Sequence, residues 1–187
     1  MLNEKRLIST RDLVLTALMI ALVFLAGSVI KVPSLGGFIH IGDTMVFLSV
    51  VVLGRRKGTI ASSIGMFLVD VFAGYYMWAP FTLVIKGVMA YIVGTCMEKI
   101  NSNDKLTKEF KPGYIVAFIL GGIFMVIGYF LAGTVLAAFL TEKIGLIQGI
   151  VYASKDIVGN IIQVVTGIIL AIPLSTIVIS AKRKVFN

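Results

Sequence analysis

The sequence predicts an all-α integral membrane protein, a six-transmembrane-helix bundle with both termini cytoplasmic. Hydrophobic residues make up 58% of the chain, charged residues only 14%, and the mean hydropathy is +1.02. Soluble domains have about 45–50% apolar and about 25% charged residues. Most of the 17 lysines and arginines fall in four clusters that alternate with apolar segments. The clusters are Lys5/Arg6/Arg11, Arg55/Arg56/Lys57, Lys99/Lys105/Lys108/Lys111 and Lys182/Arg183/Lys184. Because positive charge gathers in cytoplasmic loops, these clusters orient the spans.

The expected spans follow from the apolar segments between the clusters. They cover about residues 12–30, 44–53, 59–73, 81–97, 114–139 and 147–180. The second has only about ten apolar residues, roughly 15 Å of helix. Since the hydrocarbon core is about 30 Å thick, this span must recruit the preceding connection, tilt, or be shielded by protein. The last would be about 50 Å long, so it protrudes or bends near Pro173.

We expect the connections between spans to be short on the outer side of the membrane and more basic on the cytoplasmic side. Residues 31–43 form an irregular outer loop, and residues 74–80 and 141–145 form the other two. Residues 98–112 form the main cytoplasmic loop. The spans use most of the 187 residues, so we expect residues 1–187 to form a single transmembrane domain.

Composition and motifs exclude several classes of function. The net charge of +8 is explained by loop orientation and contact with anionic membrane lipid, so we expect no nucleic-acid partner. The chain has a single cysteine, Cys96, and a single histidine, His40, which predicts no metal site and no nucleophile–base pair. The common hydrolase and nucleotide-binding motifs are missing from the sequence, so we expect no enzyme activity and no cofactor.

Four charged residues fall within the expected spans: Asp70, Lys86, Lys155 and Asp156. A charge at the centre of a bilayer costs at least about 2.5–3.5 kcal/mol, so such residues usually have a function. The predicted topology places all four in the outer half of the bundle. One interpretation is an Asp70–Lys86 ion pair that locks two helices together. The other is a polar cavity, open to the outside, that accepts a small solute, and the two can coexist.

A polar stripe on the last helix favours the cavity. Tyr152, Asp156, Asn160 and Gln163 are spaced so that they lie on one helix face. A single Asn usually joins helices, but four polar groups suit a ring compound with several donors and acceptors. These residues, with Asp70 and Lys86, are the predicted substrate-binding set.

Two outer loops complete this predicted site. His40 and Asp43 lie on the first, and His40 is either an ordinary exposed histidine or a contact to ligand or lid. Tyr75, Tyr76 and Trp78 lie on the second. They are either anchors at the lipid–water interface or rings that stack on the ligand.

Small residues on the first span predict close helix contact. Ala17 and Ala21 form an A-x-x-x-A pair, which lets another helix approach. The partner is either a helix of this bundle or a helix of another protein.

Several of these residues together resemble a known family. The segments Ile41–Thr44, Leu53-Gly54, Gly65, Asp70, Gly74-Tyr75, Ala79–Thr82 and Ile85–Gly87 resemble the substrate-binding S components of energy-coupling factor (ECF) vitamin transporters. The resemblance is closest to the riboflavin-type branch, which includes proposed carriers for hydroxymethylpyrimidine and pyridoxine. No segment like the Leu-Asp-Phe-Ser-Asp of riboflavin carriers follows the first span, which favours a smaller pyridine or pyrimidine ring over riboflavin.

The resemblance implies a multi-pass protein of a prokaryotic plasma membrane that binds one vitamin or precursor from outside. It also implies that Ala17 and Ala21 dock onto a transmembrane coupling subunit, which carries two ATPase subunits. Two alternatives come from other classes: a small integral-membrane enzyme acting on lipid or isoprenoid, and a purely structural membrane subunit.

Overall fold

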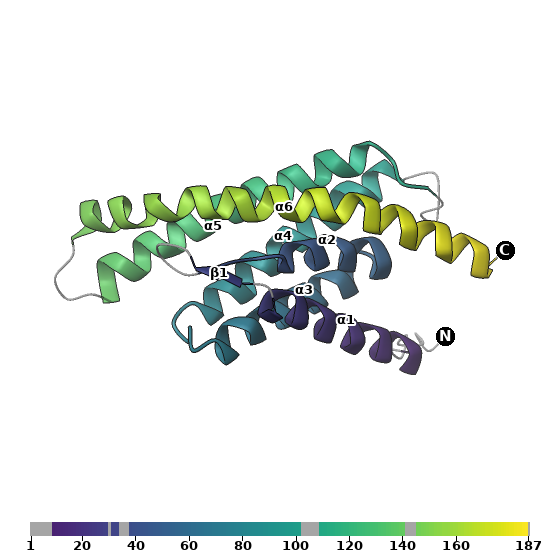
Figure 1. Cartoon of the computed structure of the whole chain (residues 1–187), viewed down its shortest axis with the longest axis horizontal. Coiled ribbons are helices and arrows are strands. Elements are labelled where there is room, and N and C mark those ends of the chain that lie inside the picture. Colours follow the sequence, from purple (N-terminus) through teal and green to yellow (C-terminus); the bar gives the residue numbers. More distant parts are fainter. Residues whose placement is uncertain (1–8, 30, 34–37, 102–108, 141–144, 187) are drawn as a thin grey trace, which may run out of the picture.

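The computed structural model describes residues 9–29, 31–33, 38–101, 109–140 and 145–186. These residues form six helices and one two-stranded sheet (Figure 1). The elements are α1 (Thr10–Val29), β1 (Lys31–Pro33), β2 (Phe38–His40), α2 (Gly42–Leu53), α3 (Arg55–Phe72), α4 (Ala79–Ile100), α5 (Gly113–Leu140) and α6 (Leu146–Phe186). Every predicted span therefore has its helix.

The first outer connection differs from the prediction. It contains an antiparallel pair of strands in which Lys31 lies opposite His40 and Val32 lies opposite Ile39. Asp43 does not lie on this loop, because α2 begins one residue before it and buries it completely. The predicted loop at residues 141–145 lies almost entirely outside the described residues, as does the middle of the predicted cytoplasmic loop.

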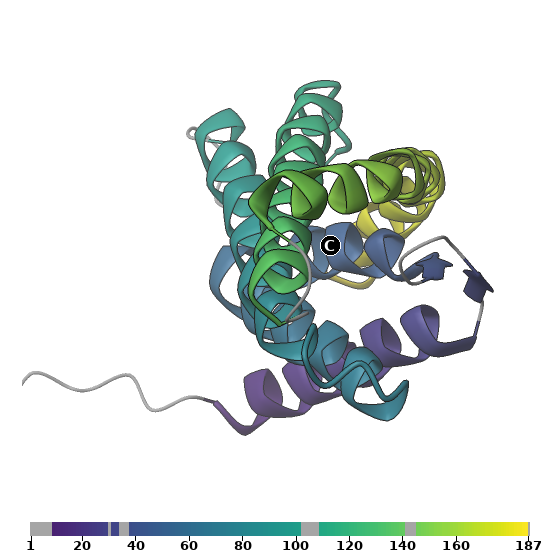
Figure 2. The same cartoon turned by 90° about the vertical axis from the view of Figure 1, so that its left-hand side faces the viewer.

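Four of the helices are long and apolar enough to cross a membrane by length and composition: α1, α4, α5 and α6. Helix α3 begins with Arg55, Arg56 and Lys57, and α2 has only 12 residues. Of the explanations considered for the short second span, shielding by protein is the one that the structure supports. Nearly all of α2 is buried, and α1, α3, α4 and α6 pack around it (Figure 2). Six crossings remain a prediction.

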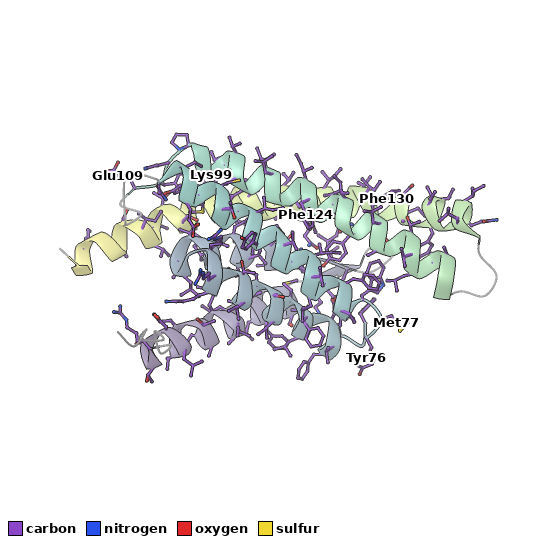
Figure 3. All side chains as sticks on the ribbon, turned by 180° about the vertical axis from the view of Figure 1, so that it is seen from behind. Tyr76, Met77, Lys99, Glu109, Phe124 and Phe130 are labelled. Carbon is purple, nitrogen blue, oxygen red and sulfur yellow. The ribbon has the colours of Figure 1, made fainter. Side chains whose placement is uncertain are left out.

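The two ends of the bundle differ in chemistry. Helix α1 begins and α6 ends at the same end, and the α2–α3 turn lies there too (Figure 1). Gly54 makes this turn with a φ of 78°, a conformation that glycine adopts without strain. Ion pairs join Lys57 to Asp12 and Arg55 to Glu98 at this basic end. Tyr76 and Met77 lie at the opposite end, far from Lys99 and Glu109 (Figure 3), which is the arrangement that positive-inside orientation requires.

The outer faces of the long helices are apolar. Large side chains such as Leu18 on α1, Ile127 on α5 and Ile169 on α6 are exposed, and sticks of this kind cover the outside of the bundle (Figure 3). Helix α6 continues for 41 residues through Pro173, about 60 Å, which is longer than a hydrocarbon core of about 30 Å. A lipid environment would cover this surface.

One glycine sets the distance between α6 and the buried start of α2. A Cβ atom at Gly167 would lie 2.9 Å from the Cβ atom of Asp43, closer than two carbon atoms can pack. Gly167 therefore lets the two helices approach, and this contact lies directly beneath the candidate site.

Candidate functional site

An open cavity lies at the end of the bundle opposite the basic end. Residues from β2, α3, the α3–α4 turn, α4, α5 and α6 line it. They are Phe38, Ile39, His40, Asp70, Tyr75, Trp78, Thr82, Tyr129, Asp156, Gly159, Asn160 and Gln163. Its mixture of rings with a few polar groups is typical of sites for small molecules.

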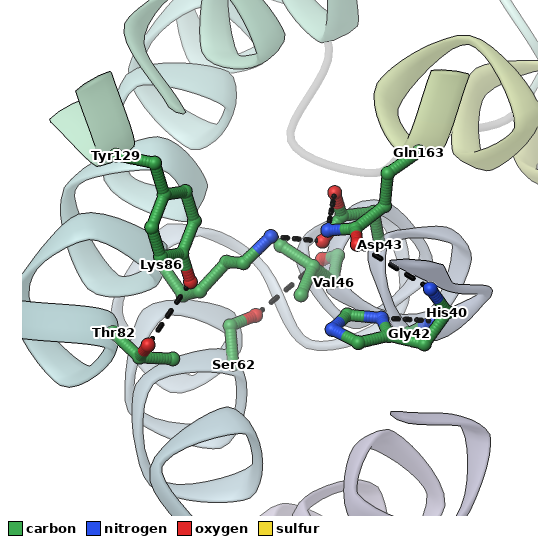
Figure 4. A network of polar contacts seen from close by, with 9 residues as sticks. All are labelled: His40, Gly42, Asp43, Val46, Ser62, Thr82, Lys86, Tyr129 and Gln163. Atoms are coloured by element: carbon green, nitrogen blue, oxygen red, sulfur yellow. Dashed lines mark hydrogen bonds and ion pairs between the residues drawn. The ribbon is translucent and has the colours of Figure 1, made fainter. Parts of the chain in front are cut away.

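A buried ion pair lies beneath the cavity. Lys86 of α4 donates to Asp43 Oδ1 of α2, and both side chains are fully buried. Gln163 Nε2 of α6 donates to the other oxygen, Asp43 Oδ2, at 3.0 Å. The Asp43 carboxylate therefore joins three helices (Figure 4). Opposite charges and additional hydrogen bonds are what make such burial tolerable.

The same network reaches the hairpin. Gln163 Oε1 accepts a hydrogen bond from the backbone N–H of His40 at 3.4 Å, and His40 Nδ1 accepts one from the backbone N–H of Gly42 at 3.1 Å. Burial lowers the pKa of His40 to about 4, so the ring is neutral at pH 7 and Nδ1 keeps the lone pair that this bond needs. His40 thus holds the hairpin against α6 and α2.

The opposite wall carries a second set of polar contacts. The Tyr129 hydroxyl donates to Thr82 Oγ1 at 3.1 Å, and the Thr82 side chain lies close to the Asp70 carboxylate. Lys86 Nζ lies 5.3 Å from the centre of the Tyr129 ring, within the range of a cation–π interaction. This wall and the Gln163–His40 wall flank the Lys86–Asp43 pair (Figure 4).

Aromatic rings form part of the cavity wall. Tyr75 meets Phe38 edge to face, with ring centres 5.2 Å apart, and Trp78 lies 6.1 Å from Tyr129. These rings provide faces against which a flat ligand can stack.

The structure brings together most of the residues predicted for the site. His40, Asp70, Tyr75, Trp78, Asp156, Asn160 and Gln163 all line the cavity. Asn160 is half-buried and makes no hydrogen bond to the described part of the chain through its side chain. Its amide is therefore available to a ligand.

Other predicted residues lie elsewhere. Tyr76 is 68% exposed and Tyr152 is 42% exposed. Tyr152 shares the helix face of Asp156 but lies one turn closer to the outer end of α6, beyond the lining. Lys86 lies beneath the lining, and its ion pair is with Asp43 rather than with Asp70. Lys155 is exposed.

The sequence analysis missed several lining residues and the partner of Lys86. Thr82 and Gly159 had signals in the sequence: Thr82 belongs to the Ala79–Thr82 motif, and Gly159 precedes Asn160. Tyr129 is one of few polar side chains in a very apolar span, which is itself a signal. No signal in the sequence indicated Phe38 or Ile39, because only the hairpin, which was not predicted, places them at the cavity.

The arrangement suits the binding of a small molecule. No cluster of three or more potential metal ligands occurs among the described residues. The polar groups at the floor are already engaged with one another, which fixes their positions, whereas the lining offers rings and hydrogen-bonding groups.

Removing one partner of the buried pair should destabilise the protein strongly. We predict that Asp43→Ala lowers the free energy of unfolding by about 3–5 kcal/mol, because it leaves the Lys86 charge buried and unpaired. The double variant Asp43→Leu/Lys86→Met should recover most of this loss. Unfolding in detergent, followed by circular dichroism, measures both.

Asp12→Ala is the matched control, since it breaks the half-exposed pair with Lys57 and should cost less than about 1 kcal/mol. Equal stability of Asp43→Ala and Asp12→Ala would contradict a structural role for the buried pair.

Comparison with known proteins gives the family. The family model for the ECF-type riboflavin transporter, S component, matches residues 7–180. A protein of Pyrococcus woesei, described as an uncharacterised protein in a gap 3′ region, is 33% identical over 147 residues, 72% of this chain and 93% of that protein. The thiamine precursor transporter HmpT of Lactococcus lactis subsp. cremoris is 28% identical over 171 residues, 90% of this chain and 87% of that protein.

A solved structure supports the fold. The S component for biotin from an ECF-type ABC transporter superposes with a TM-score of 0.61, covering 98% of this chain and 95% of that one. The two chains are only 16% identical, so this match concerns the fold alone. From the family model and the coverage of the relatives, we conclude that this chain belongs to the family of ECF-type riboflavin transporter S components.

Proposed function

We propose that this protein is the high-affinity substrate-binding subunit of an ECF-type importer and takes up a small aromatic-ring vitamin or precursor. The observation that carries the proposal is the cavity, in which rings and the amide and carboxylate groups of α6 face one space. The protein itself does no chemistry. Its orientation in a prokaryotic plasma membrane, with both termini in the cytoplasm, would open this cavity to the outside.

A pyridoxine-like or hydroxymethylpyrimidine-like ring is the favoured substrate. The similarity to a thiamine precursor transporter over most of both chains supports a single pyrimidine ring. Riboflavin, which the family's description names, is the alternative. Uptake would require a transmembrane coupling subunit and two ATPase subunits.

Binding can be followed with a built-in probe, because Trp78 is the single tryptophan of the chain and lines the cavity. We predict that Asn160→Ala weakens binding of the hydroxymethylpyrimidine ring at least tenfold, about 1.4 kcal/mol, since a ligand group would lose its partner. Titration of the purified protein with hydroxymethylpyrimidine, pyridoxine and riboflavin, read out by tryptophan fluorescence, gives the affinities.

The control is Tyr152→Phe, on the same helix but outside the lining, which should bind like the unmodified protein. Equal affinity of Asn160→Ala and Tyr152→Phe would count against the assigned site. If none of the three compounds changes the tryptophan fluorescence, this substrate class is rejected.

Helix α1 is the proposed docking surface for the coupling subunit. Ala17 and Ala21 are exposed, whereas Met19, Val23 and Gly27 are buried against the bundle. The small-residue pair is therefore free of the internal packing that was the alternative explanation. Close approach of a partner helix requires small side chains at such positions.

We predict that Ala17→Trp abolishes uptake by cells while leaving ligand affinity unchanged, because the indole ring would hold a partner helix away. Ile169→Trp, at an exposed position of α6, is the control and should transport normally. Normal uptake by Ala17→Trp would show that docking occurs elsewhere.

A further inference from the structure

The hydrogen-bond network fixes which atom Gln163 offers to the cavity. A carboxylate only accepts hydrogen bonds, so the atom that contacts Asp43 Oδ2 at 3.0 Å must be the amide nitrogen, Nε2. The oxygen, Oε1, then faces the His40 N–H, which it accepts at 3.4 Å. An amide oxygen has two lone pairs, so Gln163 presents an acceptor at the cavity wall.

The hydrogen bonds on the opposite wall of the cavity likewise determine which groups donate and which accept. Tyr129 donates to Thr82 Oγ1, so the single hydroxyl proton of Thr82 is left to donate to Asp70. Asp70 lines the cavity and has a second carboxylate oxygen, which also accepts only. Asp70 and Gln163, which both line the cavity, therefore supply one acceptor from α3 and one from α6.

The charge of the cavity lining also favours a ligand without an anionic group. The described lining residues include the carboxylates Asp70 and Asp156 and neither lysine nor arginine. Lys86 lies beneath them and is engaged with Asp43. Lys31, on the hairpin, lies over the Phe38 ring at 4.3 Å. An anionic group on the ligand would have to enter beside carboxylates.

We propose that Asp70 and Gln163 act as a pair of acceptors that select a ring bearing N–H or O–H donors, such as an amine or hydroxymethyl group, and reject an anionic substituent. This inference rests on the proposed function. Thr82 and Tyr129 are positioning residues. Tyr129 holds the Thr82 hydroxyl, and Thr82 in turn holds the Asp70 carboxylate. Asp43 has the same role for Gln163.

The test compares matched ligands by Trp78 fluorescence. The probes are 4-amino-5-hydroxymethyl-2-methylpyrimidine, its 4-methoxy analogue, which replaces the amine by a group without an N–H, and the phosphate monoester of the amine compound. We expect the amine to bind at least tenfold more tightly than the 4-methoxy compound and at least a hundredfold more tightly than the phosphate ester. The ratio of affinities is the readout, because a general loss of structure would weaken every probe.

Two variants connect the preference to the residues. Asp70→Asn replaces an acceptor by a group that also donates, so the preference for the amine should fall to less than threefold. Tyr129→Phe keeps the ring beside Trp78 but frees Thr82, and it should reduce the preference in the same direction. Size-exclusion chromatography checks that each variant is folded.

Each outcome decides a different point. Equal binding of the amine and the 4-methoxy or phosphate compounds overturns the inference and leaves the proposed function standing. An unchanged preference in both variants overturns the role of Asp70. If neither these probes nor pyridoxine and riboflavin alter the fluorescence, both the inference and the proposed function fail.

Discussion

The buried ion pair between Lys86 and Asp43 is the interaction on which the rest of the structure depends. Each charge is completely removed from solvent, and neither would be tolerated there alone. Pairing them requires that α4 and the start of α2 meet in the centre of the bundle, and Gly167 allows α6 to close over the contact. The remaining carboxylate oxygen of Asp43 then orients Gln163, and Gln163 holds the hairpin through His40. The floor of the cavity and the segment beside its mouth are therefore positioned by a single carboxylate.

The cavity lies at one end of an apolar bundle. The hydrogen-bonding groups of the cavity lie opposite the end where Arg55 and Lys57 pair with Glu98 and Asp12. The exterior between these ends is hydrophobic, and α1 adds a surface of small residues at Ala17 and Ala21. This separation fits a transport subunit: ligand contacts inside at one end, and contacts with lipid and partner helices outside.

Much of the fold could be predicted from the sequence because it depends on patterns that the membrane imposes. Apolar length and the basic clusters located all six helices. The charged and polar residues in those helices indicated a shared cavity, and Asp70, Asp156, Asn160 and Gln163 do line one. The predicted partner of Lys86, Asp70, was wrong because only acidic residues within the expected spans were considered as partners. Asp43 lies in the first turn of α2. The sequence analysis assigned it to the preceding loop, because so short a helix gives no clear signal of the residue at which it begins. The hairpin at Phe38–His40 was missed for a related reason: three-residue strands leave no periodic pattern.

The central claim is that the cavity above this ion pair opens to the outside of the cell. Single-cysteine labelling tests it most directly, in a Cys96→Ser background with Tyr75→Cys at the cavity and Glu98→Cys at the basic end. A membrane-impermeant maleimide should label Tyr75→Cys in intact cells, added ligand should slow that labelling, and Glu98→Cys should react only after the cells are permeabilised. Labelling of Tyr75→Cys only after permeabilisation would contradict the account.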